Sequence, residues 1–138
     1  MTDGITQATV AENGASPYAV SITVSGHALS GDEPIAFGGG DTGPAPYDLL
    51  TASLGECTAM TVRWYAKQQN WPLDKVEVVV THRKESVEGS PKKMDVFEKS
   101  IKLHGDALSD EQRRKLIEVS AKCPIQRTLA GAPVIKTI

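Results

Sequence analysis

Residues 43–61 have the sequence GPAPYDLLTASLGECTAMT, which contains the start of the main predicted helix. Proline is tolerated in the first turn of a helix because its missing N–H would have no partner there, so we predict a helix that begins near Pro46. The negative charge of Asp48 is favourable near the positive N-terminal end of the same helix. The predicted helix extends to about Gln69.

One face of this helix is predicted to contain a cysteine among its larger side chains. At about 100° per residue, steps of three and four positions keep residues on one face, here Leu50, Leu54, Cys57, Thr61 and Trp64. We therefore expect Cys57 to face packing partners. Small residues occupy other faces and would let another helix approach closely, so the helix is predicted to be central and buried.

The residues before this helix have a strand-and-hairpin pattern. Runs at 8–10 and 18–24 are predicted strands, separated by glycine-containing turns, the second of which covers residues 26–31. A third short strand is expected at 35–37. The glycine- and proline-rich stretch 38–46 then forbids regular structure and is predicted to be a loop.

The C-terminal half is predicted to contain two strands and a second helix. Residues 76–82 and 96–105 are the expected strands, and the second alternates apolar and polar side chains. A capping box at 109–112 opens a helix that runs to about Lys122. The tail is expected to contain a short turn and to close as an edge strand at 133–138.

Length and composition favour one globular α+β domain over residues 1–138. The chain is 40% hydrophobic and 23% charged, which excludes disordered, collagen-like and coiled-coil classes. Its 15 Lys and Arg against 17 Asp and Glu give a net charge of −2, so nothing favours a nucleic-acid partner. No apolar run approaches the roughly 20 residues of a spanning helix, and no export signal is evident, so we expect a cytoplasmic protein without a membrane partner.

The two cysteines, Cys57 and Cys123, are the residues most able to carry chemistry. They are too few for a disulfide framework. If one were oxidised to a sulfenic acid, the other could condense with it to a disulfide, provided that the fold brings them together. The alternative is that both are buried and fill space, as free cysteines commonly do.

Metal and cofactor sites have little support in the sequence. The three histidines, His27, His82 and His104, form no close-spaced ligand pair with either cysteine. The glycines at 38–40 lack the Gly-Lys-Ser/Thr ending of a phosphate-binding loop. We therefore expect no metal and no cofactor.

Two segments, residues 43–61 and 123–129, resemble the OsmC/Ohr family of cysteine-dependent peroxidases, and most closely its OsmC-like, YhfA-type branch. In order and spacing the resemblance covers nearly the whole chain. It implies an α+β subunit with two sheets wrapped around central helices in an intertwined homodimer, with active sites at the subunit interface.

The resemblance also implies a division of labour between the cysteines. Cys57 matches the peroxidatic cysteine, which attacks the peroxide, and Cys123 matches the resolving cysteine. The implied substrate is an organic hydroperoxide or hydrogen peroxide, in an antioxidant or stress-response role. The implied reductant is a dithiol, which in the family can be a lipoylated protein.

The sequence departs from the family's peroxidases at two supporting positions. Those members use an arginine from the N-terminal strands and a glutamate ten residues before the reactive cysteine. Here no arginine precedes Arg63, and Tyr47 stands at the glutamate position. Arg127 is our preferred substitute cation, with a surface ion pair as its alternative role.

The remaining candidates have weaker supporting roles. Tyr47 could donate a hydrogen bond to a bound peroxide, although packing against the loop is its alternative role. Glu56 is no simple substitute for the glutamate, because a carboxylate beside a thiol raises the thiol's pKa. Arg63 points elsewhere on the helix and would reach the site only from a partner subunit.

Three hypotheses follow for the function. The first is a thiol peroxidase that uses Cys57 and Cys123 as its redox couple. The second is a non-catalytic binder of a small apolar ligand or redox signal, and the absent N-terminal arginine motivates it. In the third, both thiols are structural and unreactive.

Overall fold

The computed structural model describes residues 4–138, and it is an α+β structure as predicted. The chain divides into two compact units, one up to Leu49 and the other from Leu50 to Ile138. Each unit is described separately below. The expectation of one domain over residues 1–138 stays a prediction.

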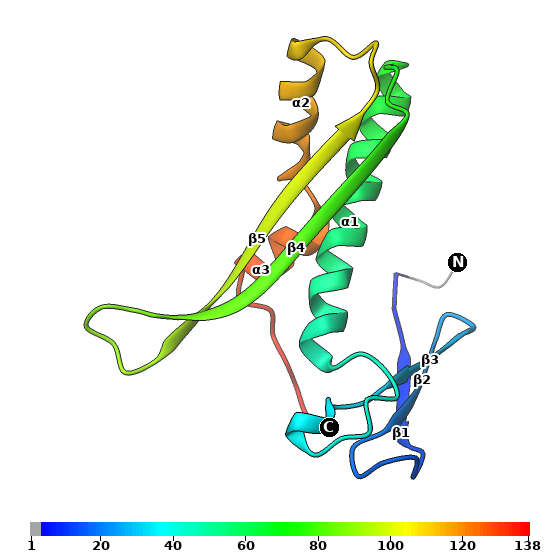
Figure 1. Ribbon diagram of the computed structural model, residues 1–138, viewed down its shortest axis with the longest axis vertical. Coiled ribbons are helices and arrows are strands. Elements are labelled where there is room, and N and C mark those ends of the chain that lie inside the picture. The colour runs from blue at the N-terminus through cyan, green and yellow to red at the C-terminus, as the bar shows by residue number, and fades with distance from the viewer. Residues whose placement is uncertain (1–3) are drawn as a thin grey trace. The chain divides into compact units, whose positions relative to one another are not determined.

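The first unit is built on a three-stranded antiparallel sheet with the order β1-β2-β3 (Figure 1). Its strands are β1 (Ala8–Glu12), β2 (Val20–Val24) and β3 (His27–Gly31). The third strand lies where the sequence predicted only a turn. Ser25 and Gly26 both have positive φ, 50° and 78°, so a two-residue turn suffices and pairing resumes at His27.

The predicted strand at 35–37 is wrong, because Ile35–Phe37 forms a 3₁₀ helix, η1. The element follows Pro34 and ends at Gly38, whose φ of 90° glycine adopts readily. A short apolar run does not distinguish a strand from a helical turn. Both Ile35 and Phe37 are exposed in this structure.

The loop after η1 is organised around the buried carboxylate of Asp32. Its two oxygens accept hydrogen bonds from the hydroxyls of Ser16 and Thr42 and from the backbone amides of Glu33, Gly40 and Thr42. Burial alone would raise the pKa of Asp32, but these hydrogen bonds outweigh it and hold the pKa well below its usual value. Asp32 therefore fixes a loop that the sequence indicated only by its glycines and prolines.

Replacing Asp32 by asparagine is expected to destabilise the protein at neutral pH and to remove part of its acid sensitivity. Because the folded pKa lies below the unfolded value near 3.8, the carboxylate stabilises the fold above that pH and loses this effect as the pH falls further. Thermal unfolding from neutral pH to about pH 2 measures the difference. Asp41→Asn, in the same loop, is the control, and an equal acid slope in wild type and Asp32→Asn would contradict the assignment.

The second unit contains most of α1, a long β-hairpin and two further helices (Figure 1). Its elements are α1 (Pro46–Gln69), β4 (Lys75–Ser86), β5 (Lys93–His104), α2 (Asp110–Ser120) and α3 (Pro124–Ala130). The predicted bounds of α1 are confirmed. Both strands of the hairpin are longer than predicted, because pairing continues through the polar residues as far as Ser86 and Lys93.

The core of this unit lies among α1, α2 and the neighbouring loops. It consists of Val62, Ala66, Leu73, Leu108 and Leu116, with Tyr65, Trp71, Val76 and Leu103 packed against it. The buried positions of α1 are Leu54, Thr58, Val62 and Ala66. The predicted buried face is therefore partly wrong: Trp64 is 61% exposed, whereas the smaller Thr58 and Ala66 are inaccessible.

The capping box before α2 is confirmed. The Ser109 hydroxyl accepts from the Gln112 amide, and the Gln112 side chain accepts from the Ser109 amide. The helix ends at Ser120, slightly earlier than predicted. The tail differs more: a helix, α3, replaces the expected short turn, and the predicted edge strand at 133–138 is not formed.

Candidate functional site

Folding brings Cys57 and Cys123 together within the second unit. Cys57 lies in the middle of α1, and Cys123 immediately precedes α3. Both are free thiols, and they lie close enough that each shifts the pKa of the other. Cys57 is partly exposed, whereas Cys123 has no exposed surface.

Two small features of the sequence allow this approach. At Gly55, an added Cβ would lie only 3.3 Å from the Cγ2 of Val80, so the glycine lets α1 lie close against β4. Pro124 occupies the first turn of α3, where its fixed φ suits a helix start. The chain therefore turns into α3 directly after Cys123 and presents its sulfur to α1.

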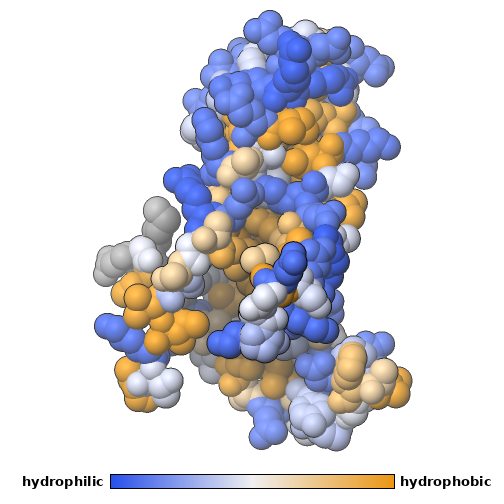
Figure 2. Space-filling model, turned by 90° about the vertical axis from the view of Figure 1, so that its left-hand side faces the viewer, coloured by the Kyte–Doolittle hydropathy of each residue, from blue (hydrophilic) through white to orange (hydrophobic). Residues whose placement is uncertain are grey.

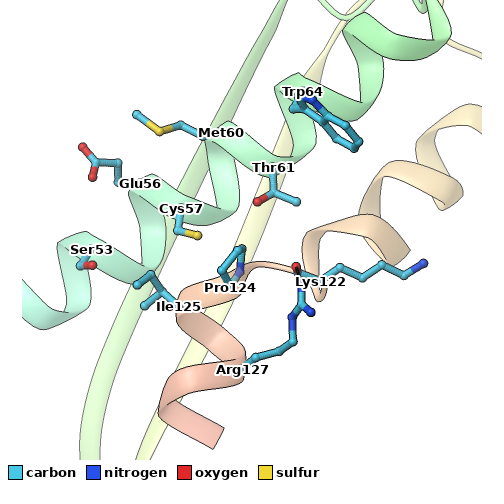
Figure 3. Close-up of a pocket in the computed structure, with 10 residues that line it drawn as sticks. All are labelled: Ser53, Glu56, Cys57, Met60, Thr61, Trp64, Lys122, Pro124, Ile125 and Arg127. Carbon is cyan, nitrogen blue, oxygen red and sulfur yellow. Dashed lines mark hydrogen bonds between the residues drawn. The ribbon is translucent and has the colours of Figure 1, made fainter. Parts of the chain in front are cut away.

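A pocket of about 570 Å³ opens beside Cys57 (Figure 3). It is lined by Ser53, Glu56, Cys57, Met60, Thr61, Trp64, Lys122, Pro124, Ile125 and Arg127. The sulfur of Cys57 points across the pocket toward Pro124 and Ile125, whereas the side chains of Glu56 and Met60, on the pocket wall, are directed away from this sulfur (Figure 3). Cys123 does not line the pocket, so an entering molecule would meet the sulfur of Cys57 first.

The two thiols differ in their electrostatic environment. Burial and the neighbouring Cys123 raise the pKa of Cys57, and the amide of Ile125 and the hydroxyl of Thr61 oppose this only in part. Burial also acts to raise the pKa of Cys123, but the hydrogen bond from Cys57 and the groups around it lower the net value. The pair therefore favours one thiolate, held by a hydrogen bond from the other sulfur.

Backbone amides at the start of α3 contribute to this effect. The amides of Gln126 and Ile125 lie near the sulfur of Cys123 and lower its pKa. Cys123 does not form a regular capping hydrogen bond through its side chain.

The sequence analysis missed a cation next to the pair. Lys99, on β5, donates hydrogen bonds to the hydroxyl of Thr58 at 3.1 Å and to the carbonyl of Ser120 at 2.9 Å. Burial lowers the pKa of Lys99, and attraction by Cys123 and Cys57 partly offsets this. One sign of this residue was available in the sequence. Lys99 stands in a series of alternate residues of β5 that are otherwise apolar.

Of the cations predicted to support the site, only Arg127 lies at the pocket. Its guanidinium donates to the carbonyl of Lys122 at 3.0 Å, and within residues 4–138 it forms no ion pair with a carboxylate. The guanidinium of Arg63 instead donates to the carbonyls of Leu73, at 2.6 Å, and Asp74, at 3.2 Å. Arg63 thus holds the segment after α1 through these hydrogen bonds, and it does not line this pocket.

The two other candidates are both exposed. Glu56 is on the pocket wall, next to Cys57 in the chain, but its side chain is directed away from the sulfur (Figure 3). Tyr47 lies in the first turn of α1, in the first unit, and is 46% exposed. Their predicted roles stay predictions.

Two of the histidines, His82 and His104, pair with carboxylates in the hairpin. His82 contacts Asp95 at 2.8 Å, and His104 contacts Glu77 at 2.9 Å, both as cross-strand pairs in the hairpin. Over the described part of the chain, no group of three or more His, Cys, Asp or Glu residues is arranged to hold a metal ion. No helix in residues 4–138 has the length and apolar character needed to cross a membrane.

Comparison with solved structures finds the same fold. An OsmC-like protein from Mycoplasma pneumoniae has a TM-score of 0.76 at 20% identity, covering 94% of this chain and 89% of the other. An organic hydroperoxide resistance protein from Legionella pneumophila gives 0.64 at 18%, covering 95% and 93%. The organic hydroperoxide resistance protein OhrB of Bacillus subtilis gives 0.60 at 21%, covering 92% and 91%.

Comparison of the sequence with family models identifies the family of the chain. No curated protein matches the chain. The family model described as OsmC-like protein matches residues 38–138, which include α1, the hairpin and both cysteines. This is well over half of the chain, and the resemblance of residues 43–61 and 123–129 is confirmed. The chain is therefore a member of the OsmC-like protein family.

Proposed function

We propose that the protein is a thiol peroxidase in which Cys57 and Cys123 form the redox couple. The observation that carries the proposal is the proximity of the two interacting thiols beside a pocket that is lined by Cys57 and not by Cys123. A pair in contact can form a disulfide with little movement, and a partly exposed first sulfur gives the peroxide access. The buried, unreactive pair of the structural hypothesis does not account for the pocket.

The proposed reaction consumes one peroxide for each disulfide. The Cys57 thiolate attacks the terminal peroxide oxygen, so that an S–O bond forms, the O–O bond breaks and an alcohol or water leaves with a proton. The sulfur of Cys123 then attacks the sulfenic acid, an S–S bond forms and water leaves. A dithiol reductant returns two electrons and two protons, and a lipoylated protein is a candidate for this role.

The proton must first move within the pair. Because Cys123 has the lower pKa, the charge lies preferentially on the buried sulfur. Transfer of the proton from Cys57 to Cys123 makes Cys57 the nucleophile. Burial therefore shields the thiolate when it is on Cys123, and the accessible sulfur reacts when the thiolate is on Cys57.

An organic hydroperoxide suits the pocket better than hydrogen peroxide alone. Met60, Trp64, Pro124 and Ile125 supply apolar surface for an organic group, and Cys57 lies beside them. The names of the Legionella pneumophila and Bacillus subtilis proteins, which refer to organic hydroperoxide resistance, support the same substrate class. Turnover of hydrogen peroxide remains part of the proposal.

Titrating the reduced protein with organic hydroperoxide tests the proposal. One equivalent is expected to remove both thiols and yield one intrachain disulfide between Cys57 and Cys123, measured by thiol counting and peptide mass spectrometry. Cys123→Ser is the control: it should stop at a Cys57 sulfenic acid that dimedone traps. If Cys57 is oxidised no faster than free cysteine, the proposed peroxidase activity is refuted.

A non-catalytic binder is the second candidate function. It is favoured by the departure at Tyr47 and by the absence of an arginine before Arg63. A binder would retain its affinity for a small apolar ligand in Cys57→Ser or Cys123→Ser and would show no accelerated oxidation. The peroxide titration therefore separates the two functions.

We further propose an intertwined homodimer in the cytoplasm. Met60 and Trp64, on α1, are 63% and 61% exposed, and Val79, on β4, is 61% exposed. Hydrophobic side chains also gather in patches between charged ones on the face shown in Figure 2. Exposed apolar area of this kind is usual at protein interfaces, and the mass in solution checks the dimer.

A further inference from the structure

Lys99 occupies a position where a lysine is unusual. It shares one face of β5 with Phe97, Ile101 and Leu103, which are all partly buried, whereas the alternate positions 98, 100 and 102 are exposed. Lysines at such positions are normally paired with a carboxylate. Within residues 4–138, Lys99 forms no such ion pair.

The contacts of Lys99 lead directly to the cysteine pair. Its ammonium group has three hydrogens, and two of them are donated to the Thr58 hydroxyl and the Ser120 carbonyl. Thr58 is fully buried and donates its one hydroxyl hydrogen to the carbonyl of Leu54 at 2.8 Å, and its proximity lowers the pKa of Cys123. Lys99 and Cys123 therefore both lie beside Thr58.

The register of the hairpin explains why Lys99 reaches this point. Lys99 pairs with Val80 on β4, and Val80 is the residue against which Gly55 allows α1 to lie close. The helix turn that follows Gly55 contains both Cys57 and Thr58. This close approach of helix and hairpin thus lies beside the cation and the cysteine of α1.

We propose that Lys99 is a positioning cation that stabilises the single thiolate of the Cys57–Cys123 pair, an inference that rests on the proposed thiol chemistry of that pair. Both sulfurs interact electrostatically with Lys99. Because such attraction is mutual, an ammonium group favoured by a thiolate also favours that thiolate. Lys99 thereby supplies, from β5, a positive charge for a site with no arginine before position 63.

Other charged groups surround the pair and must be distinguished from Lys99. The pocket at Cys57 is lined by Glu56 on α1, by Lys122 just before α3 and by Arg127 on α3. Asp95 on β5 lines a separate cavity with Lys99, but its carboxylate already contacts His82 and Lys84. The cavity also contains the unpartnered side-chain oxygen of Gln126, which carries no charge. Of these groups, only Lys99 contacts Thr58.

A purely structural role for Lys99 is the competing explanation. Ser120 is the last residue of α2, and a lysine that donates to its carbonyl also stabilises the end of that helix. Glutamine at position 99 could still donate to a carbonyl but has no charge. A change in thiol ionisation, with the fold retained, therefore separates the two roles.

The experiment measures thiol ionisation in Lys99→Gln and Lys99→Arg. We expect Lys99→Gln to raise the apparent pKa of the first thiol ionisation by about one unit, and to slow iodoacetamide alkylation of Cys57 about tenfold below the wild-type midpoint. Lys99→Arg should recover most of both effects. Thiolate absorbance and alkylation rates against pH are the readouts, and circular dichroism checks the fold.

Lys102→Gln is the matched control. It removes the same charge from the same strand, but its side chain lies on the exposed face of β5. We expect wild-type ionisation in this variant. The proposal is overturned if folded Lys99→Gln ionises like the wild type, or if Lys102→Gln produces an equal shift.

A second measurement needs no substitution and remains decisive if Lys99→Gln does not fold. Oxidising the wild-type pair to its disulfide with a disulfide exchange reagent removes the thiolate, so the pKa of Lys99 should fall, by about one unit, in a lysine NMR titration. An unchanged Lys99 pKa would contradict the proposal. These readouts involve no peroxide, so an inert pair in the peroxide titration and an uncoupled lysine are separate results.

Discussion

Replacing Cys57 by serine is expected to lower the second-order rate with an organic hydroperoxide at least about a thousandfold, as losses of catalytic nucleophiles commonly do. A serine hydroxyl does not ionise near neutral pH, whereas a thiolate is both charged and strongly nucleophilic. Stopped-flow mixing of the reduced protein with peroxide measures the rate. The loss is specific to chemistry if Cys57→Ser unfolds at the wild-type temperature.

The comparison with Cys123→Ser shows which sulfur reacts first. That variant is expected to keep the initial oxidation within about tenfold of wild type, because the attacking sulfur and its pocket remain while the neighbouring thiol that tunes it is lost. Comparable large losses in both variants would mean that the buried sulfur is the nucleophile. A rapid reaction in Cys57→Ser would contradict the assignment directly.

Replacing Leu116 by alanine is expected to lower the free energy of unfolding by about 3 kcal/mol, in the middle of the range for buried leucines. Leu116 has no exposed surface and packs in the core cluster of the second unit with Val62, Ala66, Leu73 and Leu108. Its loss would leave a cavity among α1, α2 and the flanking loops. Urea unfolding, with the wild-type slope retained, measures the change.

Ile117 provides the matched control for this substitution. It is the next residue of α2 but is 45% exposed, so Ile117→Ala should cost about 1 kcal/mol or less. Equal losses at the two positions would show that the core is not centred on Leu116. Because the core adjoins the cysteine pair through α1, Leu116→Ala also tests whether the site depends on this packing.

The sequence predicted the elements with strong local signals. Pro46 set the start of α1, and the Ser109–Gln112 box set the start of α2, because both rely on contacts within one helical turn. The strand at 27–31 was missed because a positive φ at Ser25, a non-glycine residue, is not evident from its identity. Helix α3 was predicted only as a short turn, because it has only seven residues.

The burial of α1 could not be predicted from side-chain size. Apolar spacing placed Trp64 inside, but the buried positions include Thr58 and Ala66, whose side chains are small. Contacts between distant elements decide which face is covered. The same limit applies to Lys99, whose position in β5 was visible in the sequence while its contact with Thr58 depends on the packing of α1.

The site residues show the same difference between local signals and contacts made by distant elements. Cys57 and Cys123 were identified from chemistry and resemblance, and the structure brings them into contact. Arg127 was chosen for its proximity to Cys123 in the chain, and it lies at the pocket but donates to the carbonyl of Lys122. A cation contributed by a distant strand has no signature in the local sequence.

The unequal accessibility of the two sulfurs decides how a disulfide between them would be reopened. A reductant that enters the pocket reaches Cys57, so the mixed disulfide forms on α1 and Cys123 departs. A leaving thiol of lower pKa departs faster, and the backbone amides of Gln126 and Ile125 still act to lower the pKa of Cys123 at this step. The fold thus directs electrons to one sulfur and makes the concealed one the better leaving group.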